Sequence, residues 1–175
     1  MKKVILFTAI LFFTYYSFSQ IRVIKPIANT PANSTSCCGF RAYNSTELPM
    51  GAGFGKESKI VFDKELFDDG NAFQGAYYKA PSDGVYQFNL QLGIKGTNTD
   101  AEPAQVVVKI STNNNQSNTQ LLYIPAKYDG NLTTESTALF KLKTGEEVSV
   151  ILIGTSSAKA ITTGNLSYFS GVKLY

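Results

Sequence analysis

Four acidic residues gather within a short stretch of the chain, at Asp63, Glu65, Asp68 and Asp69. Carboxylate oxygens are the ligands that Ca²⁺ prefers, and the ion takes roughly six to eight of them. The spacing is not that of a calcium-binding motif, and Asp is an ordinary turn former. The group is therefore a calcium candidate, with a solvated turn as the alternative.

Histidine is absent from the chain. Its absence removes the most common general base, a frequent metal ligand and the usual pH switch. A hydrolase without histidine would need a Ser-Lys or a paired-carboxylate site, and no spacing in the sequence favours either. We therefore expect no catalytic residues, no enzyme activity and, calcium apart, no cofactor.

Cys37 and Cys38 are the only cysteines, and they are adjacent. Neighbouring cysteines bond to each other only through a strained ring, because their Cα atoms are about 3.8 Å apart. Neighbouring strand residues also point to opposite faces. Two interpretations stay open: a disulfide between subunits near an assembly axis, or one buried cysteine beside an incidental thiol.

Residues 1–19 have the form of an export signal. Two lysines precede an apolar run from Val4 to Phe18, and small residues lead to an expected cleavage between Ser19 and Gln20. The alternative, a membrane anchor, would need about 20 apolar residues, more than this run provides. We expect a secreted, periplasmic or cell-surface protein with no membrane span after cleavage.

The remaining chain divides into a lead-in and a domain. Residues 20–36 contain Pro26 and Pro31 and several small polar residues, which predicts a flexible N-terminal segment. Residues 37–175 have the length of one domain. The net charge of the whole chain is +3 with its lysines scattered, so nothing favours nucleic acid as a partner.

Short apolar strands alternate with turns from Gly39 onward, and no window has the period of an amphipathic helix. This pattern predicts an all-β sandwich or barrel. We predict turns at 96–100 and 129–131, among others, where Gly, Asn and Asp gather. The predicted strands are Gly39–Tyr43, Ser58–Asp63, Ala72–Lys79, Gly84–Ile94, Ala104–Thr112, Thr119–Tyr128, Thr133–Leu142, Glu147–Ile153 and Leu166–Tyr175.

The most patterned stretch is Gly75–Phe88, which reads GAYYKAPSDGVYQF. We interpret it as a hairpin whose turn follows Pro81 and whose second strand buries Tyr86 and Phe88 on one face. Aromatic residues on strands usually pack. The predicted core or assembly residues are Phe40, Phe62, Tyr78, Tyr86, Phe88, Phe169 and Gly171.

Some strands are apolar almost throughout, as in the run Val148–Ile153. A sheet with one wet face would alternate apolar and polar residues instead. Both sides of such a strand need cover, one from the core and the other from a second copy of the chain. The alternative is a thick sandwich that covers both faces itself.

The chain from Gly39 to Tyr175 resembles the globular domain of complement C1q and its relatives in the C1q/tumour necrosis factor superfamily. The matching segments occur in the family's order and spacing. The closing strand departs from the family pattern at Val172 and Lys173. The segments are Gly39–Ala42, Ile60–Asp63, Asp69–Phe73, Gly75–Phe88, Leu142–Val148 and Phe169–Leu174.

The resemblance implies a jelly-roll of two antiparallel sheets, a homotrimer, and binding rather than catalysis. Some domains of this kind bind calcium. We therefore expect an exported trimeric recognition module that binds a surface glycan, polymer or protein through its loops. The polar loop 113–118 is a candidate, with a plain hairpin tip as the alternative. The alternative is a structural or adhesive assembly protein that is tethered through its N-terminal segment.

Overall fold

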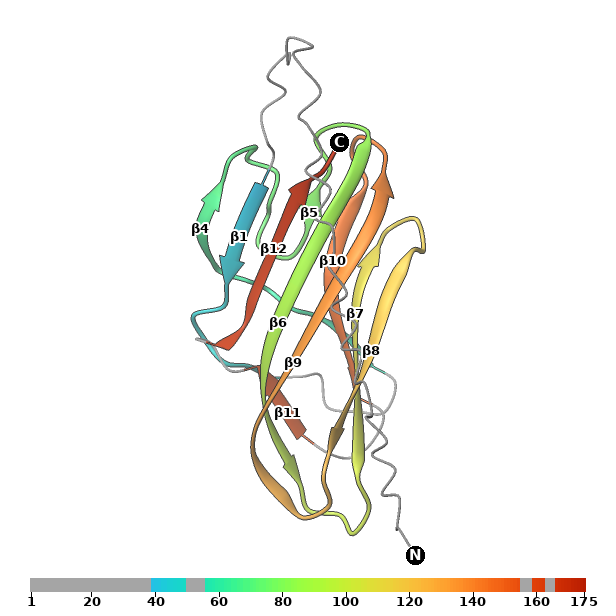
Figure 1. Cartoon of the computed structure of the whole chain (residues 1–175). Coiled ribbons are helices and arrows are strands. Elements are labelled where there is room, and N and C mark those ends of the chain that lie inside the picture. Colours follow the sequence, from blue (N-terminus) through green and yellow to red (C-terminus); the bar gives the residue numbers. More distant parts are fainter. Residues whose placement is uncertain (1–38, 50–55, 155–158, 163–165) are drawn as a thin grey trace, which may run out of the picture. The chain divides into compact units, whose positions relative to one another are not determined.

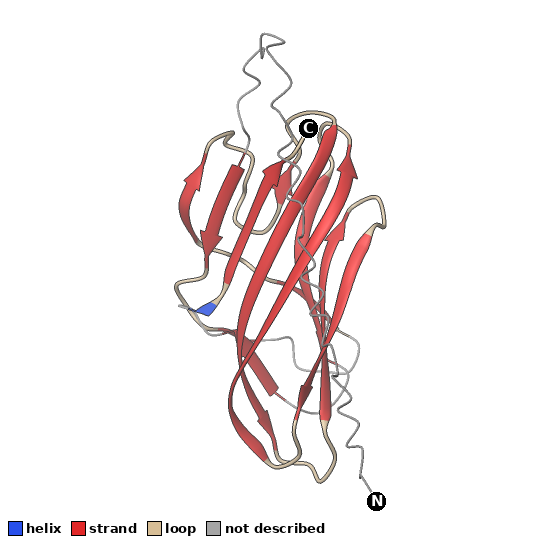
Figure 2. Cartoon of the chain, in the orientation of Figure 1, coloured by secondary structure: helices blue, strands red, loops and turns tan. Residues whose placement is uncertain are grey.

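The computed structural model describes residues 39–49, 56–154, 159–162 and 166–175. Strands make up almost all of the regular structure in these ranges, with a short helical turn at Leu166 (Figure 2). The predicted export signal, the lead-in and both Cys37 and Cys38 lie outside the described residues. Within those residues, no helix has the length and apolar character needed to cross a membrane.

The strands form two antiparallel sheets (Figure 1). Sheet A has seven strands. Six of them follow the order β2-β11-β6-β12-β1-β4, and the seventh, β9, is a further partner of β6. Its strands are β1 Gly39–Tyr43, β2 Leu48–Pro49, β4 Lys64–Asp68, β6 Gly84–Asn98, β9 Tyr128–Leu142, β11 Lys159–Thr162 and β12 Tyr168–Lys173.

Sheet B has five strands, in the order β3-β10-β7-β8, and β5 pairs with the start of β10, whereas β3 pairs nearer its end. The two sheets confirm the predicted antiparallel β sandwich. The strands of sheet B are β3 Glu57–Lys59, β5 Tyr78–Lys79, β7 Ala104–Thr112, β8 Ser117–Ile124 and β10 Glu147–Gly154.

Alternation along the strands sends apolar side chains between the sheets. On β6, Tyr86, Phe88 and Leu90 are buried, whereas Asn89 is exposed and Gln91 is half-buried. Successive side chains of a strand point to opposite faces, so each sheet has an inner face in the core and an outer face. The outer face of sheet A therefore carries the polar residues of β6.

Aromatic rings from the two sheets pack against one another in the core. Phe40 of sheet A stacks on Tyr78 of sheet B, with ring centroids 4.9 Å apart, and on Phe73 at 4.7 Å. Phe169 meets Phe40 edge-on at 5.2 Å and stacks on Phe88 at 5.8 Å. Such pairs add about 0.5–1.5 kcal/mol each beyond the area that they bury.

The residues predicted for the core or assembly surface all lie in this interior. The six aromatic ones are at most 2% exposed, and Gly171 is also buried. A Cβ on Gly171 would lie 2.7 Å from atoms of both Phe40 and Phe88, so glycine is the residue that this position accommodates. The six aromatic residues are Phe40, Phe62, Tyr78, Tyr86, Phe88 and Phe169.

The predicted hairpin within Gly75–Phe88 is wrong. Its first strand is short, β5, and pairs with β10 in sheet B, whereas its second strand, β6, belongs to sheet A. The segment therefore crosses from one sheet to the other. Backbone bonds that link Ala80 to Gly145 and Glu146 fix this crossing, because they hold the chain to the β9–β10 turn.

Several predicted boundaries also fail. Strand β3 ends at Lys59, and the unpredicted strand β4 follows, so Ile60 and Phe62 are buried outside any strand. Strand β6 extends into the turn predicted at 96–100 as far as Asn98, and β9 runs through the turn predicted at 129–131. The two strands pair from Gly84↔Leu142 to Asn98↔Tyr128, so long-range pairing overrides the local turn composition.

Smaller differences affect three other predicted strands. Of the predicted Ala72–Lys79, only β5 is a strand. Strand β8 ends at Ile124 rather than at Tyr128, and β12 ends at Lys173 rather than at Tyr175. By contrast, β1 and β7 begin and end at the predicted residues.

Candidate functional site

The acidic calcium candidates do not come together as one site. Asp63 accepts hydrogen bonds from the amide and hydroxyl of Ser45, at 2.6 and 2.5 Å, which hold the pKa of Asp63 below its usual range. Asp68 accepts a hydrogen bond from the amide of Phe73, at 2.9 Å. Among the described residues, no three Cys, Asp or Glu side chains are placed to hold a metal ion. Calcium binding stays a prediction.

One carboxylate at the loop end of the sandwich has a strongly shifted pKa. Asp83 accepts a hydrogen bond from Lys143 Nζ at 2.8 Å, and others from the amide and hydroxyl of Thr144. These bonds lower the pKa of Asp83 to about 2 and raise the pKa of Lys143. Both groups are exposed to solvent, and the cluster ties the start of β6 to the turn after β9. Its role is structural.

The outer face of sheet A presents three rows of side chains across β1, β12, β6 and β9. Strand register defines the rows, because residues paired across neighbouring strands point to the same face. The rows are Gly39, Val172, Gln87 and Leu139; Arg41, Ser170, Asn89 and Thr137; and Tyr43, Tyr168, Gln91 and Glu135.

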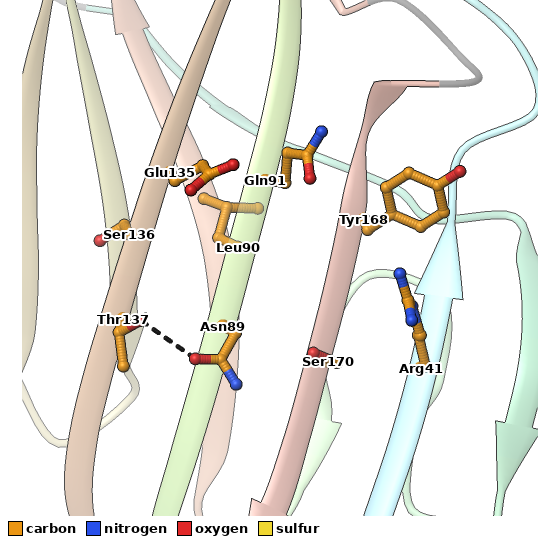
Figure 3. Close-up of a pocket in the computed structure, with 9 residues that line it drawn as sticks. All are labelled: Arg41, Asn89, Leu90, Gln91, Glu135, Ser136, Thr137, Tyr168 and Ser170. Carbon is orange, nitrogen blue, oxygen red and sulfur yellow. Dashed lines mark hydrogen bonds between the residues drawn. The ribbon is translucent and has the colours of Figure 1, made fainter.

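A shallow groove of about 260 Å³ runs across this face, and we call it the Ser170 groove (Figure 3). Arg41 and Tyr168 line one side, and Glu135 lines the other. The Arg41 guanidinium carbon lies 5.0 Å from the centre of the Tyr168 ring. Between them, the hydroxyl of Thr137 donates a 3.0 Å hydrogen bond to the side-chain oxygen of Asn89.

A second depression, the Gly39 hollow, lies beside the groove. It has a volume of about 370 Å³, and Phe67, Val172 and Gly39 are among its lining residues. A Cβ on Gly39 would lie 3.6 Å from the Phe67 ring, so a side chain there would fill part of the space. Phe67 and Val172 are 48% and 38% exposed, which leaves apolar walls open to solvent.

The β9 side of the same face projects where the β1 side recedes. Leu139 of β9 is 61% exposed. Glu135 precedes Thr137 by two positions on the same strand. Three strand spacings separate β9 from β1, roughly 14 Å, so Glu135 does not reach Arg41 of its own protomer. The face therefore has an apolar projection and the Glu135 carboxylate on one side. On the other side it has a hollow with apolar walls, whose lining also includes Arg41 and Asp69.

The outer face of sheet B has a different composition. Leu121 and Tyr123 of β8 are 50% and 54% exposed, and Val107 of β7 is half-buried. The neighbouring Lys109 pairs with Glu57 at 3.6 Å on this face. This face is apolar at one end. Lys109 and Glu57 are paired within the protomer, and Lys59, which is opposite Ile151 in the register, is exposed.

The family comparison identifies the domain. The family model described as the C1q domain matches residues 40–174. The chain belongs to the C1q domain family. No curated protein matches the chain by sequence.

Solved structures share the fold of this C1q domain. The globular domain of zebrafish complement 1qA aligns with a TM-score of 0.54 at 15% identity, over 79% of this chain and 98% of that one. Murine APRIL gives 0.53 at 15% identity, over 79% and 100%. The Eiger TNF of S. frugiperda gives 0.52 at 12% identity, over 79% and 93%. These likenesses confirm the predicted C1q/tumour necrosis factor-like jelly-roll.

C1q and tumour necrosis factor-like domains are generally non-enzymatic binding modules. They generally form trimers and bind protein ligands, and C1q domain proteins are typically extracellular.

Of the residues that line the Ser170 groove, only Arg41 and Ser170 lie in the segments that resemble the C1q family. One signal was available. The middle of β6 has the outward residues Gln87, Asn89 and Gln91, and a charged outward residue follows only at Lys95. A run of uncharged polar residues agrees with the depletion of charge at the centre of protein interfaces.

Proposed function

We propose that this C1q domain is an exported, non-catalytic recognition module that works as a ring of three copies. The predicted export signal and the extracellular setting typical of the family support export. The general tendency of the family to form trimers supports the ring. The observation that carries the proposal is the complementarity between the two sides of the outer face of sheet A.

The apolar part of this complementarity pairs Leu139 with the Gly39 hollow. Leu139 shares its row with Gly39 and Val172, so the projection and the hollow lie at the same height along the strands. Rotation about an axis roughly parallel to the strands preserves height. Leu139 of one copy then reaches the walls formed by Phe67 and Val172 of the next copy, and the contact removes exposed apolar surface from water.

The charged part pairs Glu135 with Arg41. Glu135 shares its row with Tyr168, whose ring lies beside the Arg41 guanidinium. The same rotation brings the carboxylate of one copy to the guanidinium of its neighbour. Arginine and carboxylate form strong, directional pairs, which would set the register of the contact.

Such a contact joins two different surfaces of the same chain. A contact of this kind is head-to-tail, and it gives a closed ring when the rotation closes. Three copies satisfy every projection and every hollow. A two-fold pair would do so too, because residue i then meets j and j meets i, so the choice of three copies follows the general tendency of the family. The neutral side chains of the Ser170 groove would then lie inside the assembly, where uncharged polar groups are cheaper to desolvate than ions.

We place ligand recognition on the loops rather than on the outer face of sheet A. Polar loops join the strands at both ends of the sandwich, and exposed loops on a rigid scaffold often carry binding. The ligand class proposed is a surface glycan, polymer or protein.

Light scattering on the chain without its predicted signal tests the assembly. We expect one species with about three times the protomer mass. A clean monomer at micromolar concentration would contradict the ring. Glycan and protein arrays probed with the purified protein test recognition, and silence across both would count against it.

A further inference from the structure

A third depression lies at the loop end of the sandwich, and we call it the loop-end hollow. It has a volume of about 450 Å³. Its lining shares no residue with the Ser170 groove or the Gly39 hollow. The lining residues are Gly70, Asn71, Ala72, Gln74, Tyr77, Lys79, Ala80, Pro81, Thr144 and Gly145.

We propose that the loop-end hollow binds a saccharide unit that carries a carboxylate. This inference rests on the proposed recognition function and names its ligand class and its location. None of the lining residues belongs to the three rows on the outer face of sheet A, so assembly through that face leaves the hollow accessible on each copy.

The backbone that surrounds the hollow is held in place before any ligand arrives. The amide of Lys79 donates to the carbonyl of Ala72 at 2.8 Å, and the amide of Gly145 donates to the carbonyl of Ala80 at 2.7 Å. These bonds join the loop before β5, the segment after β5 and the β9–β10 turn. A preformed site avoids the entropy cost of ordering loops on binding.

The floor of the hollow is apolar, and its walls are polar. Ala72 and Ala80 are 6% and 1% exposed, and Tyr77 is half-buried beside them. Asn71 and Gln74 are exposed, and their amides can both donate and accept hydrogen bonds. Sugar hydroxyls also do both, and the C–H face of a sugar ring suits the apolar body of a tyrosine.

The charge of the lining points to an anionic ligand. Lys79 is its one charged residue among those described, and no carboxylate lines the hollow. A Cβ on Gly145 would lie 3.9 Å from Lys79 Cε, so the lysine stem runs along the rim. Glu147 is opposite Lys79 in the strand pairing but does not line the hollow. The Asp83 carboxylate is bound to Lys143 and Thr144.

The test uses the purified protein, with its assembly state measured by light scattering on the same sample. Trigalacturonate and sialyllactose are the carboxylated probes, and galactotriose and lactose are their neutral counterparts. Calorimetry gives the affinities, and saturation-transfer NMR reports which sugar protons lie against the protein. We expect at least one carboxylated probe to bind about tenfold more tightly than its neutral counterpart, because an interaction with a charged group is stronger.

Two variants and two matched controls locate the site. Lys79→Gln should remove the preference for the carboxylated probe, and Tyr77→Ala should weaken binding about tenfold or more. Lys109→Gln and Tyr123→Ala change the same residue types on the outer face of sheet B, and binding should be unchanged. All four variants are compared with the parent for assembly and Tm.

Each outcome supports or contradicts either the saccharide site or the ring of three copies. Lack of binding to both carboxylated probes, equal binding of neutral and carboxylated probes, or equal losses in variants and controls would overturn the saccharide site. A trimer that binds none of the probes leaves the assembly proposal intact. A monomer that binds a carboxylated probe through Tyr77 and Lys79 would overturn the ring and support the site.

Discussion

The two outer faces of the sandwich differ in how their exposed side chains are arranged. Sheet B exposes Leu121 and Tyr123, and its Lys109 pairs with its own Glu57. Sheet A exposes Leu139 on one side and keeps an open apolar hollow on the other. Apolar content alone does not distinguish protein interfaces from other surfaces. Complementarity between the two sides of a face is more informative, and sheet A has it.

The protomer itself covers most of the apolar run of β10. Its apolar run suggested that a second copy covers its outer side. In the structure, Val150 and Leu152 are buried in the core, and the protomer already half-buries Ile151 and Ile153. The run therefore does not require a partner on sheet B, although such a partner stays a prediction that the variants below can test.

The largest effect is expected at Leu139. The Leu139→Asp variant would place a carboxylate in the Gly39 hollow of the neighbouring copy. Asp69 of the same lining would repel this carboxylate, and Arg41 there is paired with Glu135 in the proposed contact. Burying such a charge costs about 3 kcal/mol or more, so light scattering should show monomers that retain the strand signal in circular dichroism. The matched variant Leu121→Asp, on sheet B, should remain a trimer. The opposite result would make sheet B the assembly face.

Gly171 and Ser170 are neighbours on β12, but Gly171 faces the core and Ser170 faces outward. Gly171→Ala should destabilise the fold by about 1–3 kcal/mol, because the new Cβ would press on Phe40 and Phe88. Ser170→Ala points to the outer face and should change stability by less than about 0.5 kcal/mol. Urea unfolding at one protein concentration measures both. Equal losses would mean that the core adjusts to the extra methyl group.

Strand and turn patterns predicted an all-β sandwich or barrel because they are local properties of the sequence, and the resemblance to C1q domains added the two-sheet jelly-roll. β1 and β7 begin and end at the predicted residues, and in β7 buried and half-buried residues alternate throughout. The hairpin around Pro81 failed because sequence proximity does not reveal whether two strands share a sheet. The stretch Asp129–Asn131 has turn composition, yet its pairing with β6 makes it strand.

The candidate face could not be predicted in the same way. The Gly39 hollow depends on the register of β1 with β12 and on the position of Phe67 in β4. Leu139 lies far along the chain, and only the pairing of β6 with β9 brings it to the same height. Register across four strands is a long-range property, which no local pattern in the sequence encodes.

A charge exchange gives a smaller and more specific test of the face. Arg41→Glu and Glu135→Arg should each weaken assembly about tenfold, because like charges would then meet between copies. The double variant should recover much of that loss, since the pair is restored with its direction reversed. Sedimentation equilibrium measures the association constants. Losses that simply add in the double variant would show that the two side chains do not meet.

The smallest effect is expected at Asp83, which lies on neither outer face. Its folded pKa of about 2 is below the ordinary value of 3.8, so its ionised form favours the folded state. This contribution is present above about pH 4 and is lost as the pH falls towards 2. Asp83→Asn should therefore lower Tm slightly near neutral pH, by an amount that high salt reduces, and the difference from the parent should vanish near pH 2. Assembly at neutral pH should be the same in both proteins. A difference in Tm that persists at pH 2 would assign the effect to the geometry of the turn rather than to the charge of Asp83.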